Sequence, residues 1–242
     1  MSNEDIVGSI FGWIGTFLSI YFYIAPVFPF IKVLKDQMSY ENSPIILIVA
    51  SFLNCILWAD YGLQKDSTQI YISNSLGGTI TLIWITIYLM YLGKKYFALT
   101  LVINILLLII MGVVSYVFYF IVNDYYTGLL AMIFNVLMYA GAGEKIFQVI
   151  KTGNFELIPI FSTIGGFACS LCWIIFGIYQ NDRNVIIPNA LGLFFALIQA
   201  IIYLIYYCRQ NNKNKKENIK DLIQENKWVN EKLDIVYILL FY

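Results

Sequence analysis

A stretch of 48 residues occurs twice in this chain and constrains its fold more than any other feature. Residues 44–91, moved along by 115 positions, align without a gap with residues 159–206. A duplication of this length predicts two copies of one structural unit. The matches include residue types that a shared apolar bias would not align, namely Pro44 with Pro159, Trp58 with Trp173, Gly62 with Gly177, Asn74 with Asn189 and Gly77 with Gly192.

The composition places these copies in a membrane. Hydrophobic residues make up 60% of the chain and charged residues only 12%, whereas soluble domains average about 45–50% and about 25%. The apolar residues form runs of about 20, which is the length that crosses a bilayer as a helix. The sequence therefore predicts an all-α, multi-pass integral membrane protein.

Seven runs are candidate transmembrane helices. They cover about residues 11–31, 45–63, 70–92, 97–122, 127–150, 158–179 and 185–207. Three crossings alone would invert a second copy, so the fourth run, which is almost purely aliphatic, is predicted to be a lipid-exposed linker that keeps the two copies parallel. This 3+1+3 arrangement assigns residues 1–94 to the first three-helix repeat, 95–123 to the linker, 124–208 to the second repeat and 209–242 to a cytosolic tail.

The basic residues of the loops predict the orientation. Cytosolic loops carry an excess of Lys and Arg, and an acidic start such as MSNED is unlike the basic beginning of a signal peptide. The N-terminus is therefore expected outside or in the lumen, and the C-terminus in the cytosol. One side holds Lys32, Lys35, Lys94, Lys95, Lys145, Lys151 and the tail from Arg209, and the other holds only Lys65 and Arg183. In the tail, one side of an amphipathic helix at the membrane surface would consist of Ile219, Leu222, Ile223 and Trp228.

Two residue types at matching positions are candidates for a binding site. Asn74 and Asn189 fall within the spans, where lipid cannot satisfy an amide, so they must face protein or a wet cavity. Trp58 and Trp173 add flat apolar ring faces with a polar edge. Ring faces together with amides suit a sugar, which has C–H faces and a rim of hydroxyl groups. The alternatives are that each Asn ties helices together and that each Trp belongs to an interfacial belt.

Prolines at the ends of the spans are the second feature of the two copies. Pro26, Pro44 and Pro159 fall towards the cytosolic end of a span. The missing N–H of a proline weakens a helix and allows it to bend. The pattern predicts hinges for an inner gate, with a packing kink as the alternative for each position.

Other polar residues point to no further chemistry. Asp60 has Ile175 as its counterpart, so it is either a carboxylate at the edge of a loop or a proton-coupling acid outside the duplicated machinery. Cys169 and Cys172 share a helix without any His or a second CxxC pair, which does not predict a metal site. Because no nucleophile–base pair is visible, the chain is not expected to be an enzyme or to need a cofactor. Helix packing is the role expected of Gly77, Gly78, Gly165, Gly166 and Gly192.

The motifs in order resemble one family over about residues 11–207. In the first copy these are AP-V-FPF-IKVLK, SP, LNCILWADYG and N-x-x-G, and in the second VIKTGNFELIP, W-x-x-x-G and PNALG. This set is similar to the SWEET sugar transporters, whose halves are called MtN3/saliva repeats. The resemblance implies a facilitator that moves mono- or disaccharides down their gradient by alternating access. It also implies an assembly that is often trimeric, in a plasma membrane or an endomembrane, with no nucleic acid as a partner.

The resemblance also assigns roles to individual residues. It places the sugar between the repeats, on the Asn pair Asn74 and Asn189 and the Trp pair Trp58 and Trp173. Positions that tune substrate size are matched by Asn54 and Cys169, and the same pocket would be lined by Ser19, Phe22 and Met138.

The chain departs from the family at one hinge. The family has four hinge prolines, and a one-residue gap puts Ala142 opposite Pro26, so the fourth proline is absent. Gly141 and Gly143 flank this position and supply flexibility without it. We expect an altered symmetry of the gate.

Two other functions stay open on the sequence alone. A PQ-loop-type exporter of amino acids or other small solutes would couple to protons through Asp60. A seven-helix receptor or cargo-binding membrane protein is the other possibility, although a receptor has no need for an ungapped duplication.

Overall fold

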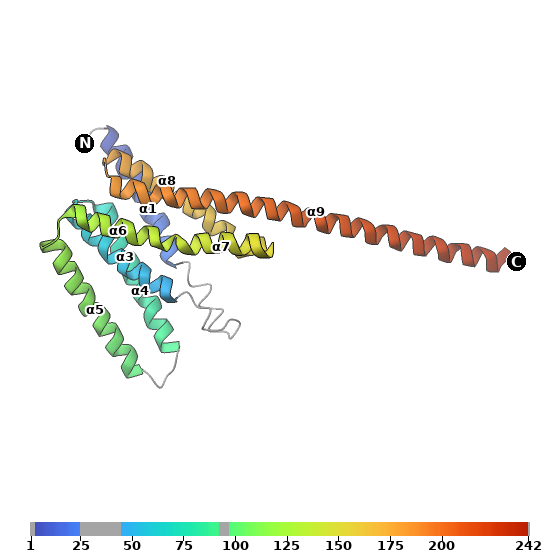
Figure 1. Ribbon diagram of the computed structural model, residues 1–242, viewed down its shortest axis with the longest axis horizontal. Helices are drawn as coiled ribbons and strands as arrows, with labels where there is room; N and C mark the ends of the chain where they lie inside the picture. Colours follow the sequence, from blue (N-terminus) through green and yellow to red (C-terminus); the bar gives the residue numbers. More distant parts are fainter. Residues whose placement is uncertain (1–2, 25–44, 92–96, 242) are drawn as a thin grey trace.

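The protein is built from helices. The computed structural model describes residues 3–24, 45–91 and 97–241, and every regular element in these ranges is helical (Figure 1). Helices satisfy their own backbone hydrogen bonds, as a lipid environment requires, and this confirms the predicted all-α class. In chain order they are α1 (Asn3–Ile24), α3 (Ile45–Gln64), α4 (Thr68–Tyr91), α5 (Phe97–Phe120), α6 (Asp124–Met138), α7 (Ala140–Thr152), the 3-10 helix η3 (Phe155–Leu157), α8 (Ile160–Tyr179) and α9 (Arg183–Phe241).

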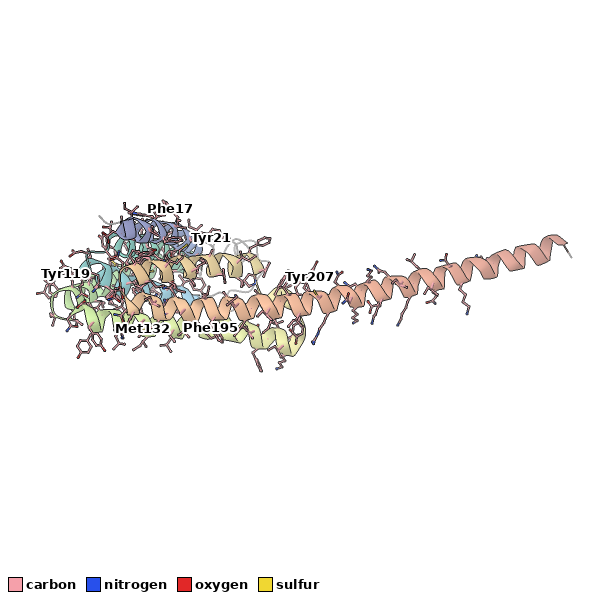
Figure 2. All side chains as sticks on the ribbon, turned by 90° about the horizontal axis from the view of Figure 1, so that it is seen from above. Phe17, Tyr21, Tyr119, Met132, Phe195 and Tyr207 are labelled. Atoms are coloured by element: carbon pink, nitrogen blue, oxygen red, sulfur yellow. The ribbon has the colours of Figure 1, made fainter. Side chains whose placement is uncertain are left out.

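The helices have the length and surface of membrane spans. Within the described ranges, six segments are long and apolar enough to cross a bilayer: α1, α4, α5, α6 together with α7, α8, and the first part of α9. The 20-residue α3 occupies the remaining expected span. Large apolar side chains such as Phe17 and Tyr21 of α1 and Tyr119 of α5 lie on the outside of the body (Figure 2). Contact of such apolar side chains with lipid carries no free-energy cost, whereas their contact with water would be unfavourable.

Both copies use the same helix packing. The second and third helices of each copy pack on one another, as α3 on α4 and α8 on α9. The first helix of each copy packs on the middle helix of the other, as α1 on α8 and α6 on α3. Much of the interface between the copies is therefore made by α1 and α6, the first helix of each copy.

The turn between the second and third helices is the same in both copies. Asp66 and Asn181, 115 positions apart, are both left-handed, with φ of 52° and 51°. The next residue closes the turn, since the Ser67 N–H donates to the Gly62 carbonyl at 2.8 Å and the Asp182 N–H donates to the Gly177 carbonyl at 2.8 Å. This is the Schellman arrangement of a helix C-terminus. The duplication seen in the sequence is thus a duplication of backbone geometry.

The linker helix α5 lies against the first copy. It packs against α3 and α4, and none of its most apolar stretch is buried. The sequence predicted a lipid-exposed linker, and the exposed leucines and isoleucines of α5 agree with that.

The fifth span differs from its prediction as one continuous helix, because the structure divides it at Tyr139. The Tyr139 N–H donates to the Val136 carbonyl at 3.0 Å, one residue short of the α-helical partner, and α7 begins at Ala140. The sequence at the break is YAGAG, and glycines lower the cost of departing from helical geometry. The interruption therefore lies three residues before Ala142, where the fourth proline is missing.

Both ends of the chain differ from the expected boundaries. α1 begins at Asn3 rather than near residue 11, and the acidic Asp5 in its first turn suits the positive end of a helix dipole. α9 does not end near Tyr207 but continues to Phe241, leaving the body beyond Tyr207 (Figures 1 and 2). Its polar part has Lys and Glu at helical spacing, as in the Lys213–Glu217 pair at 3.9 Å. The predicted membrane-surface role of the tail stays a prediction.

The close packing at Gly62 generates a test of the turn. A Cβ at Gly62 would lie 2.6 Å from the Tyr71 backbone nitrogen, whereas one at Gly112 of α5 would meet nothing within 4 Å. We expect Gly62→Ala to lower the free energy of unfolding by about 1–3 kcal/mol through overpacking. Gly112→Ala is the matched control and should leave it unchanged or slightly higher, since Ala favours a helix over Gly. Thermal unfolding of the purified protein in detergent measures both, and equal midpoints would contradict the packing.

Candidate substrate-binding site

A cavity of about 400 Å³ lies between the two copies. This volume is within the usual range of small-molecule sites, about 300–1,000 Å³. Residues of α1, α3, α4, α6, α8 and α9 line it, so each copy contributes three helices. The structure brings together all nine residues predicted from the sequence, namely Ser19, Phe22, Asn54, Trp58, Asn74, Met138, Cys169, Trp173 and Asn189.

The lining repeats the sequence duplication. Sixteen of the lining residues form eight pairs of equivalent positions. The 115-residue shift relates the pairs from α3, α4, α8 and α9, and a shift of 116 relates those from α1 and the fifth span. The pairs are Ser51/Gly166, Asn54/Cys169, Trp58/Trp173, Ile70/Val185, Asn74/Asn189, Ser19/Asn135, Phe22/Met138 and Tyr23/Tyr139, and the two further lining residues are Ser73 and Ser170.

Both predicted asparagines are held in the same way. The Asn74 Nδ2 donates to the Ile70 carbonyl at 2.9 Å, and the Asn189 Nδ2 donates to the Val185 carbonyl at 2.8 Å. Each amide thereby bonds to its own helix one turn earlier. The Asn74 Oδ1 also accepts from the Tyr23 hydroxyl at 3.3 Å. The helices thus fix both amides at the cavity wall.

The two tryptophans are also held alike. Trp58 packs edge-on against Tyr61 with ring centroids 5.5 Å apart, and Trp173 packs edge-on against Phe176 at 5.5 Å. Tyr61 and Phe176 are themselves equivalent positions. The Trp173 Nε1 donates to Ser19 Oγ at 3.0 Å. Two indoles fixed by neighbouring rings give the cavity a rigid apolar wall on each side.

The polar groups beside the tryptophans differ between the copies. Asn54 Nδ2 donates to Asn135 Oδ1 at 3.4 Å, while at the equivalent place Ser19 Oγ lies 3.5 Å from Cys169 Sγ. The Asn54 Oδ1 is buried and has no partner among the described residues. Amides offer both strong donors and acceptors, whereas a thiol is weak in both roles. One side of the cavity can therefore bind hydroxyl groups more strongly than the other.

Several lining residues were missed by the sequence reasoning. The gap that pairs Pro26 with Ala142 also pairs the predicted Ser19 with Asn135, so this amide was within reach of the alignment. The sequence indicated Tyr23 and Tyr139 only indirectly, through Gly77 and Gly192, which were assigned to helix packing. A Cβ at Gly77 would collide with the Tyr23 ring, and one at Gly192 with Tyr139. The other missed positions are Ser51, Ile70, Ser73, Gly166, Ser170 and Val185.

One end of the cavity is closed, at the α3–α4 and α8–α9 turns. The Tyr61 hydroxyl lies 2.8 Å from both carboxylate oxygens of Asp182, which also accepts from the backbone N–H of Asn184 at 3.0 Å. Tyr61 and Asp182 are 2% and 7% exposed. A buried apolar cluster that includes Trp58, Trp173 and Phe176 surrounds the bond. Tyr61 comes from the first copy and Asp182 from the second, so closure joins the two copies.

Pro159 and Asp60, among the remaining predicted residues, do not line the cavity. Pro159 precedes α8 with φ −75°, where its missing N–H interrupts no helical hydrogen bond. Ala142 lies in α7, while Pro26 and Pro44 lie outside the described residues. None of the described residues that line the cavity carries a charge.

Comparison with known proteins gives matches over most of the chain. The family described as "Sugar efflux transporter for intercellular exchange" (MtN3/saliva) matches residues 9–96 and 125–211. Rice "Bidirectional sugar transporter SWEET7b" is 29% identical, with 91% of this chain and 85% of that protein covered. Arabidopsis "Bidirectional sugar transporter SWEET1" is 30% identical, with 90% of each covered. The fold is similar to the solved structure of a eukaryotic SWEET transporter, with a TM-score of 0.75 and 22% identity over 86% of this chain and all of that one. The cavity between two duplicated three-helix units and the matches to both copies thus lead to one conclusion: this chain belongs to the MtN3/saliva family of SWEET transporters.

Proposed function

We propose that this protein carries mono- or disaccharides across a membrane in both directions, by facilitated uniport with alternating access. The cavity between the copies is the single observation that carries the proposal. Its described lining combines two indoles, two equivalent asparagines and further amides and hydroxyl groups, and none of these residues is charged. The relatives named as bidirectional sugar transporters support the same substrate class.

The lining suits the surface of a sugar. A pyranose has apolar C–H faces, which stack on Trp58 and Trp173, and a rim of hydroxyl groups, which bond to amides such as Asn74 and Asn189. An uncharged cavity also suits a neutral solute, since no ion has to be desolvated or compensated. The richer amide side at Asn54 and Asn135 gives the two faces of the sugar different partners.

Alternating access follows from the closed end. Release of a solute past the α3–α4 and α8–α9 turns requires the bond between Tyr61 and Asp182 to break and the two copies to separate there. Helices α1 and α6 couple the motion of one copy to that of the other, because each packs on the middle helix of the opposite copy.

The loops assign this closed end to the outside. Lys65 and Arg183 are the basic residues at the two turns, whereas Lys145, Lys151 and the tail from Arg209 lie at the other end of the spans. By the excess of Lys and Arg in cytosolic loops, the N-terminus is outside or in the lumen and the tail in the cytosol. A trimeric assembly in a plasma membrane or an endomembrane remains part of this proposal through the family resemblance.

The geometry does not favour the alternative function of a proton-coupled exporter. An acid that couples a solute to protons has to reach the solute, and Asp60 does not line the cavity. The receptor has no observation in its favour.

The asparagine pair provides the first test of the proposal. We expect Asn74→Ala and Asn189→Ala each to lower sugar uptake about five- to 150-fold, since a lost hydrogen bond at a buried polar site costs about 1–3 kcal/mol. Uptake of labelled sugars by hexose-transport-deficient cells, normalised to surface abundance, measures this. Asn104→Ala is the matched control, because Asn104 donates to its own Thr100 carbonyl at 2.9 Å in the same way but lies outside the cavity. Normal uptake in both test variants would refute the site.

The bond at the closed end provides a second test. Tyr61→Phe keeps the ring against Trp58 but removes the donor to Asp182. Loss of a hydrogen bond to a buried acceptor costs about 1–3 kcal/mol, so we expect the outer end to open about five- to 150-fold more often. The readout is the rate at which an impermeant thiol reagent added outside modifies Cys169 in the cavity, in a variant lacking the other cysteines.

The control for this experiment is Tyr126→Phe, which removes a hydroxyl group from an exposed tyrosine at the start of α6. It should leave the rate of modification unchanged. An unchanged rate in Tyr61→Phe as well would show that the Tyr61–Asp182 bond does not hold the outer end closed.

A further inference from the structure

The side of α3 that faces away from the cavity carries two polar residues, the buried Asp60 and the half-buried Gln64. At 3.6 residues per turn they lie about 200° and about 240° around the helix from Trp58, which lines the cavity. They are one turn apart and therefore neighbours on one face. Asp60 is only 3% exposed. This face packs against the linker α5.

Gln64 is bonded to the end of the linker. Its Nε2 donates to the carbonyl oxygens of Phe118 and Val122 at 2.6 and 2.7 Å. The Val122 N–H donates to the Val117 carbonyl rather than to Phe118, so the Phe118 carbonyl is available to Gln64. One turn earlier on α5, the Ser115 hydroxyl is the hydrogen-bonding neighbour of the Asp60 carboxyl group.

Two acceptor atoms on this face are left over. The Asp60 Oδ2 and the Gln64 Oε1 are both buried, and neither has a partner among the described residues. An ionised carboxylate can only accept, so two acceptors would face the same interface without a donor. A single proton on Asp60 turns one of them into a donor for the other.

Among the residues that the structure describes, no cation is placed to compensate a charged Asp60. Helices α3, α4 and α5 contain no Lys or Arg, and the charged residue of α6 is the acidic Asp124. Lys65 follows α3 directly, but it pairs with Asp124 at 3.4 Å at the exposed end of the helices. The other titratable groups at this end are Asp66 and Arg183, which are exposed, Asp182, which bonds to Tyr61, and tyrosines such as Tyr116 and Tyr119 of α5, which are exposed. A buried charge without a partner is disfavoured in a span.

We propose that Asp60 is a proton-binding site outside the transport cavity, in which the neutral carboxyl group accepts from Ser115 and donates to the Gln64 Oε1. The bound proton completes a hydrogen-bonded contact that fixes the linker to the first copy. The equivalent residues in the second copy are Ile175 and Tyr179, and α5 packs on the first copy. The asymmetry between Asp60 and Ile175 therefore follows the position of the linker and not the transport cycle.

Infrared spectroscopy of the purified protein tests the proton directly. At neutral pH the wild type should show the carbonyl stretch of a protonated carboxylic acid, and Asp60→Asn should remove it. Asp66→Asn, which removes an exposed carboxyl group of the α3–α4 turn, is the control and should leave the band in place. Gln64→Leu should move the band to higher frequency, because the acid loses its acceptor. A spectrum without a band that depends on Asp60 would overturn the proposal.

Thermal unfolding tests the contact with the linker, whatever solute is carried. Asn supplies both a donor and an acceptor in the place of a protonated Asp, so Asp60→Asn should unfold within about 2 °C of the wild type, with uptake within about twofold and an unchanged dependence on pH. Gln64→Leu loses the bonds to α5 and should unfold about 4–8 °C lower. If Asp60→Asn unfolds as early as Gln64→Leu, or abolishes the pH dependence of uptake, the neutral contact is refuted.

Discussion

The inability of lipid to form hydrogen bonds is the constraint on which this structure depends. Every polar side chain within the spans needs a protein partner or a wet surface. Thr16 and Thr81 meet the requirement by donating to carbonyl groups of their own helices at 2.9 Å. Asn74 and Asn189 do the same with one end of the amide and present the rest to the cavity. The polar groups that do not bond to their own helix therefore collect at the cavity, at the Tyr61–Asp182 contact and at the contact of α3 with the linker α5.

The protein uses one scaffold twice and varies the chemistry on it. The helix pairs, the left-handed turn residues and the rings behind the tryptophans are the same in both copies. Equivalent positions then diverge where the copies meet. Tyr61 and Asp182 form a bond that their counterparts, Phe176 and Ser67, cannot form. One polar bond instead of two at the closed end is easier to break during a transport cycle, while the apolar cluster around it is shared by both copies.

The cavity shows the same division between a symmetric scaffold and asymmetric chemistry. Its apolar walls and its asparagine pair are symmetric, whereas the amides Asn54 and Asn135 stand opposite the hydroxyl and thiol of Ser19 and Cys169. A sugar is not symmetric, so a cavity with two unlike sides can hold it in one orientation. The break of the fifth span at Tyr139 adds a further difference, since this tyrosine lines the cavity and ends α6.

The sequence by itself determined the membrane class and the 3+1+3 order of helices, and its repeat singled out the Asn and Trp pairs that line the cavity, whereas the other five predicted cavity residues came from the family resemblance. Hydrophobic run length and an ungapped repeat are local properties, and equivalent residues of a repeat must meet around the same axis. Contacts between residues that are not equivalent were decided only by the tertiary structure. Tyr61 with Asp182 and Gln64 with the end of α5 join positions that no period in the sequence relates. The break at Tyr139 and the continuation of α9 past Tyr207 were missed for another reason, because hydropathy marks where lipid ends and not where helical hydrogen bonding ends.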